Sequence, residues 1–222
     1  MTFYELVQSL NLFSPGILLI GFSIGLNYYK SLDIVHKSIT WYFLGMIIID
    51  LASRFLTASG NNYIILLVYS LLEMMLFAYF YFRYLFKAKH RLVMSLCCAA
   101  FLYILWEIVL FESTDSKGFQ SYAKVVDDFI IIILALSFFH EKINIFKESK
   151  WDNFRLNAIV LIFFSINLVF FLPLNFLLHE SSGLKFYFWL GIVLTTVLFY
   201  SYLTHSIWKN GRTQKLLRSG LR

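Results

Sequence analysis

Residues 156–178 read LNAIVLIFFSINLVFFLPLNFLL and contain no charged side chain. About 20 apolar residues in a helix cross the hydrocarbon core of a bilayer, so this stretch is long enough to span a membrane. Further apolar stretches of comparable length flank it and are separated by short polar breaks. They cover residues 11–29, 40–57, 63–86, 92–111, 121–140 and 184–208. Because the stretches are apolar on all sides and too long for barrel strands, we predict that all of them are helices.

The composition of the chain agrees with a membrane protein. Of its 222 residues, 59% are hydrophobic, 20% aromatic and only 14% charged, against about 25% charged residues in a soluble domain. Too few charges remain to cover a surface that faces water, and 25 Phe and 14 Tyr exclude a disordered chain. We therefore predict an all-α membrane protein, a single bundle of seven transmembrane helices over residues 1–208, followed by a basic tail over residues 209–222.

The basic residues favour one orientation of this bundle. If the predicted helices alternate in direction, fifteen of the 19 Lys and Arg residues lie in the first, third and fifth loops, the adjoining helix ends and the tail. The positive-inside rule then places the N-terminus outside and the C-terminus in the cytoplasm. Lys124 counts among the few charges of the outer side. The net charge of +6 is interpreted as a collar facing anionic lipid, and no direct nucleic-acid contact is expected.

The basic tail is predicted to lie at the membrane surface. Its basic residues alternate with Leu216, Leu217 and Leu221, which suits a short helix lying on the inner leaflet. A solvated basic tail fits the same pattern, because Gly211 and Gly220 weaken a helix. The predicted membrane-surface residues are Lys209, Arg212, Lys215 and Arg218.

Ionisable residues inside the predicted helices are the main evidence for a functional site, because a charge in hydrocarbon is costly and usually faces the bundle interior. Asp50 and Glu73 fall near the midplane, and Asp127 and Asp128 lie slightly towards the outside. Polar faces of several helices can then converge on one cavity that is open to the outside. The predicted ligand- or ion-binding residues are Asp50, Arg54, Glu73, Glu107, Asp127, Asp128, Asn167 and Asn175.

A purely structural role fits some of these residues as well. Arg54 follows Asp50 by four positions, so the two can neutralise each other along one helix. Glu73 can hydrogen-bond a neighbouring helix. Even in this interpretation, the acids inside the predicted helices outnumber the single arginine. Some of the acids must therefore stay protonated or bind a cation. Such acids are typical of a proton relay, a cation path or a site for a cationic ligand.

The sequence shows no catalytic or metal-binding motif in the structural context that such a motif requires. Gly21–Gly25 spells GxSxG, but inside an apolar helix rather than at a strand-to-helix turn. The same residues form GxxxG, which supports close helix packing, either within the chain or in a homo-oligomer. The His and Cys residues lack zinc-site spacing. We therefore expect no enzyme activity, no cofactor and no metal.

One short region resembles a known group of proteins. The run from Asn62 and Tyr63 through Tyr69-Ser70-Leu71-Leu72-Glu73 follows a helix that carries Asp50. This pattern resembles small uncharacterised seven-helix bacterial inner-membrane proteins and covers about a fifth of the chain. The resemblance implies a seven-helix fold in the bacterial inner membrane and a role in envelope signalling.

The sequence leaves more than one functional hypothesis open. In the first, the protein is a receptor-like sensor or accessory subunit that binds a small ligand or lipid in an outer polar cavity. Its basic inner loops would then act on a cytoplasmic protein partner, for instance a defence effector. In the second, the protein is a proton- or cation-coupled transporter or channel that uses the midplane acids. Unbroken helices favour the first hypothesis, and the excess of acids favours the second.

Overall fold

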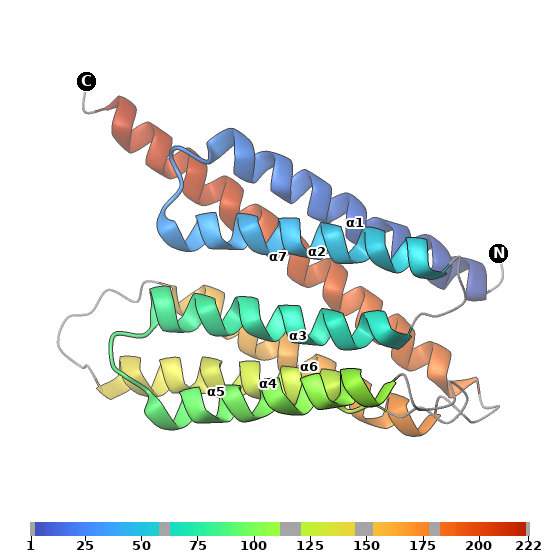
Figure 1. The fold of residues 1–222 in the computed structure, drawn as a ribbon. Coiled ribbons are helices and arrows are strands. Elements are labelled where there is room, and N and C mark those ends of the chain that lie inside the picture. Colours follow the sequence, from blue (N-terminus) through green and yellow to red (C-terminus); the bar gives the residue numbers. More distant parts are fainter. Residues whose placement is uncertain (1–2, 58–62, 112–120, 145–152, 178–182, 221–222) are drawn as a thin grey trace. The chain divides into compact units, whose positions relative to one another are not determined.

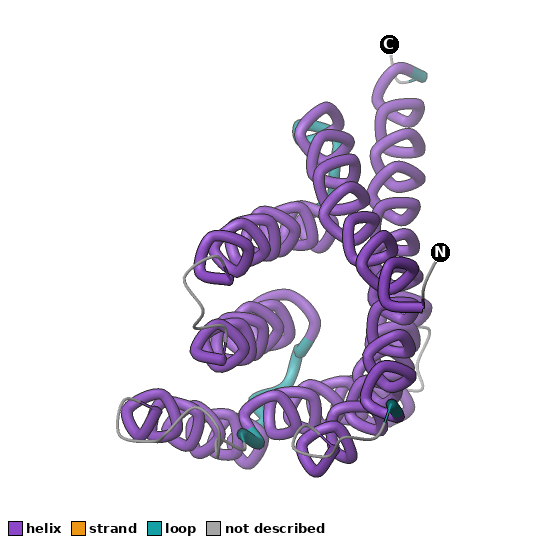
Figure 2. Tube along the Cα trace, turned by 90° about the vertical axis from the view of Figure 1, so that its right-hand side faces the viewer, coloured by secondary structure: helices purple, strands orange, loops and turns teal. Residues whose placement is uncertain are grey.

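The computed structural model describes residues 3–57, 63–111, 121–144, 153–177 and 183–220. The regular structure within these ranges is helical (Figure 2), which confirms the predicted all-α fold. Each predicted apolar stretch overlaps one α-helix, and the stretch 63–86 also includes a π-helical turn (Figure 1). The elements are α1 (Phe3–Tyr28), α2 (Ile34–Thr57), α3 (Tyr63–Phe80), the π-helical turn η1 (Tyr81–Leu85), α4 (Arg91–Phe111), α5 (Ala123–Asn144), α6 (Phe154–Leu177) and α7 (Leu184–Ser219).

The helices are those of an integral, multi-pass membrane protein. Five described helices, α2, α3, α4, α6 and α7, are long and apolar enough to cross a membrane. In α1 the apolar helix that qualifies by composition is the shorter segment Phe13–Tyr28. Helix α5 is less apolar because it carries Lys124, Asp127 and Asp128. Large apolar side chains stay exposed on the outer helices, which suits contact with lipid; on α4 they include Leu92, Leu102 and Val109.

Three helix ends differ clearly from the prediction. Helix α1 begins at Phe3 rather than residue 11. Helix α2 begins at Ile34 rather than residue 40, because the Asp33 carboxylate accepts a hydrogen bond from the backbone N–H of His36 at 2.8 Å and caps the helix. Helix α7 continues through the predicted tail to Ser219. Lys209, Arg212, Lys215 and Arg218 therefore belong to the last turns of α7 rather than to a separate helix, and they are exposed. Their place at the membrane surface stays a prediction.

The chain forms two compact units. The first contains residues 1–58 and 190–222, and the second contains residues 59–189. Helix α7 begins in the second unit and continues into the first.

In the first unit, α1 packs closely on α2 and α7 at glycines. A Cβ atom on Gly21 would overlap the buried Phe43 ring of α2 and lie 2.5 Å from Oγ1 of Thr204 on α7. A Cβ atom on Gly25 would lie 2.5 Å from Oγ1 of Thr40 on α2. The GxxxG pattern is thus occupied by contacts within the chain.

In the second unit, α5 contacts α3, α4 and α6 (Figure 1). This central position screens the charged face of α5 from lipid. Further along α5, Ile131, Leu134 and Phe138 are fully buried. We call these three side chains the apolar layer of α5. Phe77 on α3 and Phe164 on α6 are buried as well and form an edge-to-face ring pair, whose centroids are 5.0 Å apart.

The glycine contacts give a prediction about stability. Gly21→Ala should lower the thermal unfolding midpoint in detergent, because the new methyl group overpacks a closed contact, at a cost of about 1–3 kcal/mol. Gly16→Ala is the matched control on the same helix, since nothing lies within 4 Å of its added Cβ. Alanine is the better helix former, so the control should be as stable as the wild type or more stable. Equal midpoints for the two variants would contradict this packing.

Candidate functional site

The second unit contains a lysine that is buried among three carboxylates. The Lys124 Nζ atom lies 2.6 Å from Glu73 Oε2, 2.6 Å from Asp127 Oδ2 and 2.7 Å from Asp128 Oδ1. The Lys124 side chain is 2% exposed and the three acids are 0% exposed. We call these four residues the Lys124 cluster. Its members come from α3 and α5, so the ion pairs also link those two helices.

The position of Lys124 is not explained by helix formation alone. It lies in the first turn of α5, where the positive end of the helix dipole disfavours a cation. Asp127 and Asp128 follow at i+3 and i+4, and an acid after a base is the less favourable order for a pair along a helix. The requirement for a lysine here therefore comes from the tertiary site, where Glu73 of α3 completes the cluster.

Aromatic rings close the cluster. The Lys124 ammonium lies 5.0 Å from the ring centroid of Tyr69 on α3 and 5.4 Å from that of Phe164 on α6. Both distances are within the range of a cation–π interaction. Asn167, another predicted site residue, is buried on α6, three residues after Phe164 and thus on the same face of the helix.

The cluster carries more acid than base. With all four groups ionised, one lysine and three carboxylates sum to a charge of −2. Within the described part of the chain, Asp127 Oδ1 and Asp128 Oδ2 are buried without a hydrogen-bond partner. Buried anionic oxygens without donors are strongly unfavourable. The arrangement is therefore suited to taking up protons or a further cation.

The three acids also have the geometry of a cation site. One carboxylate oxygen from each of Glu73, Asp127 and Asp128 lies within 4.8 Å of the other two. Oxygen ligands of this kind suit Mg²⁺ or Ca²⁺. In this structure the Lys124 ammonium occupies the space between the oxygens, so a metal ion would have to compete with a tethered cation.

Glu107 lies at the junction of α4 and α5 and is well hydrogen-bonded. Its carboxylate accepts hydrogen bonds from Ser121 Oγ at 2.6 Å, from the backbone N–H of Tyr122 at 3.2 Å and from the Tyr103 hydroxyl. Ser121 lies three residues before Lys124 in the chain. Polar groups thus continue from the cluster towards the end of the unit where α5 begins.

On the other side of the cluster, the polar groups are interrupted by the apolar layer of Ile131, Leu134 and Phe138. Past Ile131 and Leu134, the Tyr81 hydroxyl donates to Asn157 Oδ1 at 2.5 Å, and Asn157 Nδ2 donates to the Ala135 carbonyl at 3.0 Å. Tyr81 is the first residue of η1, and π-helical turns are frequent at functional sites.

Near its last turn, α5 binds the segment that joins η1 to α4. The Glu141 carboxylate accepts from the backbone N–H of Lys87 at 2.9 Å and lies 2.8 Å from His90 Nε2. Burial raises the pKa of Glu141, but the hydrogen bonds from His90 and the backbone outweigh burial and lower the pKa below its usual value. Glu141 is therefore an ionised anchor at neutral pH.

The remaining predicted residues have different surroundings. Asp50 and Arg54 belong to the first unit and pair with each other, with Arg54 Nε 2.7 Å from Asp50 Oδ2. Their side chains are 29% and 43% exposed. That they share a cavity with Glu73 stays a prediction. The side chain of Asn175 lies outside the described residues.

The sequence interpretation was wrong about the cation that balances the acids. It counted Lys124 with the outer-side charges and treated Arg54 as the one base among buried acids. The structure instead buries Lys124 with Glu73, Asp127 and Asp128, while Arg54 is partly exposed. The signal was present in the sequence, because Lys124, Asp127 and Asp128 share one helix face at i, i+3 and i+4.

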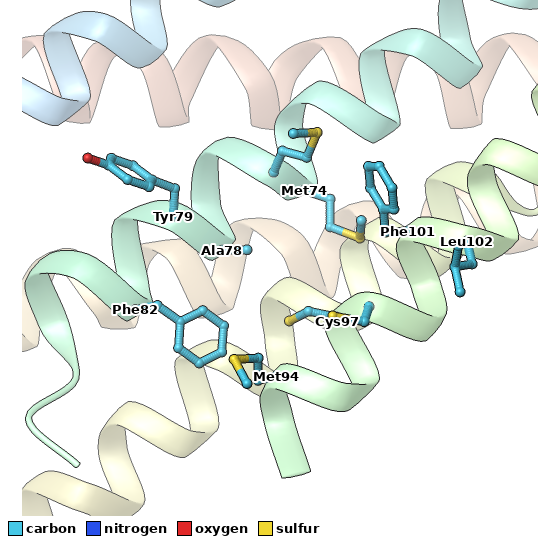
Figure 3. Close-up of a pocket in the computed structure, with 10 residues that line it drawn as sticks. Met74, Ala78, Tyr79, Phe82, Met94, Cys97, Phe101 and Leu102 are labelled. Carbon is cyan, nitrogen blue, oxygen red and sulfur yellow. The ribbon is translucent and has the colours of Figure 1, made fainter. Parts of the chain in front are cut away.

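A groove of about 460 Å³ lies between α3 and α4. Figure 3 shows Met74 and Phe82 on the α3–η1 side of the groove, and Met94, Cys97 and Phe101 on α4. The lining is almost entirely apolar, whereas the predicted cavity is polar. Met74, which lines the groove, directly follows Glu73 of the Lys124 cluster in the sequence.

Comparison with protein-family models, with curated proteins and with solved structures gives no match for this chain. The resemblance to seven-helix inner-membrane proteins therefore stays a prediction, and the functional argument depends on the site itself.

Replacing the central lysine tests the electrostatics of the cluster. Lys124→Met keeps much of the side-chain volume but leaves three buried acids without their base, which should cost about 3–5 kcal/mol. Adding Glu73→Gln, Asp127→Asn and Asp128→Asn in the same chain should restore most of the thermal stability in detergent, because no buried charge then remains uncompensated.

Lys142→Met is the matched control on the same helix. Lys142 lies in the last turn of α5, with its Nζ 5.3 Å from the Phe138 ring centroid, so its loss should cost no more than about 1 kcal/mol. If Lys124→Met and Lys142→Met unfold at the same temperature, the Lys124 cluster does not stabilise the fold.

Proposed function

We propose that the protein is a proton- or cation-coupled membrane transporter whose coupling site is the Lys124 cluster. The observation that carries this proposal is the excess of two acids over the single buried base. A cluster that served only to join helices would need one carboxylate for one lysine. The additional carboxylates provide a place for exchangeable protons or a cation.

The residues on the two sides of the Lys124 cluster support a path for protons or cations from one side only. Towards Glu107 and Ser121 the neighbouring groups are polar and can exchange protons. Towards Tyr81 and Asn157 the fully buried side chains of Ile131 and Leu134 intervene. A coupled cycle needs such a barrier, since a continuous polar path would dissipate the gradient. In this proposal, transport requires the apolar layer to open when the charge of the cluster changes.

The groove supports the second candidate, a receptor-like sensor or accessory subunit. Its apolar lining of Met and Phe side chains suits a lipid acyl chain better than a polar ligand. Because Met74 adjoins Glu73, a lipid in the groove could alter the packing of α3 against the cluster. A cytoplasmic protein partner would then receive the change through the basic loops.

We also propose that α1–α7 form seven membrane spans in a bacterial inner membrane, with the N-terminus outside and the C-terminus in the cytoplasm. The distribution of Lys and Arg supports this orientation. A fluorescent protein fused after Arg222 should fluoresce, and an alkaline phosphatase fused there should stay inactive, because that enzyme folds only in the periplasm. Active phosphatase at this position would contradict the orientation.

Proton movement in liposomes tests the transporter hypothesis. Vesicles that enclose a pH-sensitive dye, with the membrane potential clamped by valinomycin and K⁺, are exposed to a pH step in the absence and presence of a Na⁺ gradient. Wild-type protein should change the internal pH faster than empty vesicles. Glu73→Gln keeps the shape and hydrogen bonding of the side chain but removes its proton site, so it should reduce the rate to that of empty vesicles.

Lys142→Met is again the control and should move protons at the wild-type rate. A Glu73→Gln protein that matches the wild type would show that the cluster has no role in proton movement. Folded wild-type protein that moves no proton under any gradient would instead favour the sensor hypothesis.

A further inference from the structure

The first unit contains an acid–histidine–serine relay that the transport hypothesis does not use. Asp33 Oδ1 lies 2.7 Å from His36 Nδ1, and His36 Nε2 lies 3.0 Å from the Oγ atom of Ser206. Asp33 and His36 flank the start of α2, and Ser206 lies on α7, 170 residues further along the chain. Nucleophile, base and orienting acid are thus within hydrogen-bond reach in the order that nucleophilic catalysis requires.

The acid of the relay is held by other contacts. Asp33 Oδ2 accepts from Asn210 Nδ2 at 2.8 Å, and the backbone N–H of Asp33 donates to Asn210 Oδ1 at 3.2 Å. Burial raises the pKa of Asp33, but the hydrogen bonds that it accepts from His36 and Asn210 outweigh burial and lower the pKa below its usual value. An ionised Asp33 that accepts the Nδ1 proton of His36 leaves the Nε2 lone pair directed at Ser206.

Helix capping explains only part of this arrangement. A cap requires Asp33 and the backbone N–H of His36, but not a serine on Nε2. Other serine and threonine side chains of α7 donate to backbone carbonyls of their own helix: Thr195 and Thr196 to Ile192, Ser201 to Val197, and Ser219 to Leu216. Ser206 instead contacts an imidazole on another helix. Ser206 is partly exposed as a residue, and the Asp33 side chain is 38% exposed.

We propose that Ser206 is an activated nucleophile that cleaves the carboxylic ester of a phospholipid. Ser206 Oγ attacks the ester carbonyl carbon while its proton passes to His36 Nε2. The bond from that carbon to the glycerol oxygen then breaks, and the departing oxygen takes the proton from His36. Water, deprotonated by His36, attacks the acyl-serine in the same way, so the products are a fatty acid and a lysophospholipid. Asp33 orients the imidazole and stabilises its charged form.

The surroundings of the relay favour a lipid substrate. Trp41 Nε1 donates to the Tyr29 hydroxyl at 3.0 Å, Lys37 Nζ lies 5.4 Å from the Tyr29 ring, and Arg212 lies 5.6 Å from the Trp208 ring. Trp and Tyr combined with Lys and Arg mark the interface between membrane and water. Phospholipid esters lie at that level, and basic side chains attract the phosphate of an anionic lipid.

A fluorophosphonate probe tests the nucleophile directly in the full-length protein. Attack by Ser206 on phosphorus displaces fluoride and leaves a stable adduct, which mass spectrometry can assign to the peptide that contains Ser206. Wild type should form this adduct and Ser206→Ala should not. His36→Gln keeps hydrogen bonding but cannot act as a base, so labelling should slow by about 100-fold. Ser201→Ala, an exposed serine on the same helix, should label like the wild type.

Hydrolysis is then measured with phosphatidylglycerol vesicles, by the release of fatty acid and lysophospholipid. Wild type should release both, and Ser206→Ala neither. No adduct at Ser206 in folded wild-type protein, or labelling of His36→Gln at the wild-type rate, would overturn the activated nucleophile. An adduct without lipid hydrolysis would overturn the assigned substrate.

If Ser206→Ala does not fold, a cysteine variant provides a second test of activation by His36. Ser206→Cys, with Cys97 and Cys98 replaced by Ala, is nearly isosteric with the native residue. A histidine in hydrogen-bond reach promotes the reactive thiolate, so iodoacetamide should alkylate this protein faster than the same chain carrying His36→Gln. Equal alkylation rates would contradict activation by His36.

Discussion

The burial of one ammonium group among three carboxylates constrains the whole second unit. An isolated lysine in a low-dielectric interior would lose its hydration without compensation. Lys124 must therefore reach Glu73 on α3, which determines the relative register of α3 and α5. It must also be screened from lipid, which requires α5 to lie among α3, α4 and α6. The strongly apolar character of those three helices follows, because they provide the wall between the charges and the bilayer.

The same interaction separates stability from function within the cluster. One carboxylate would be enough to neutralise Lys124 and to link the two helices. The second and third carboxylates add repulsion and buried oxygens that lack donors, so they cost stability in the arrangement described. Features that cost stability in a protein interior are concentrated at functional sites. The excess of acid is therefore better explained by exchange of protons or a cation than by packing.

The sequence predicted the helices well because length and hydropathy are local properties. The runs at residues 63–86 and 92–111 agree closely with α3, η1 and α4, since a helix that crosses a bilayer must be both long and apolar. The helix ends were less predictable. The start of α2 depends on the Asp33 cap, and α7 extends past Trp208 because Gly211 lets it pass close to Tyr28 of α1, where a Cβ would lie 2.6 Å from the Tyr28 Cβ.

The candidate sites were harder to predict because they join helices that are distant in sequence. Helical periodicity groups Lys124, Asp127 and Asp128 on one face of α5, but it does not show that Glu73 of α3 meets that face. Position along the helix was also misleading, since Lys124 is close enough to the start of α5 to be taken for an interfacial charge. The relay of Asp33, His36 and Ser206 has no local signature at all, because its nucleophile comes from α7.

The charge balance of the two sites indicates why they suit different chemistry. The Lys124 cluster has an excess of anionic groups, is fully buried and contains no nucleophilic hydroxyl or thiol, which suits it to the binding and release of positive charge. In the relay, Asp33 balances the imidazolium that His36 forms when it takes the proton of Ser206, and part of the site is accessible from outside the protein. A proton moves in both proposals. In the proposed transporter the proton, or a competing cation, is the species exchanged at the cluster, whereas in the proposed hydrolase proton transfer within the relay creates the nucleophile.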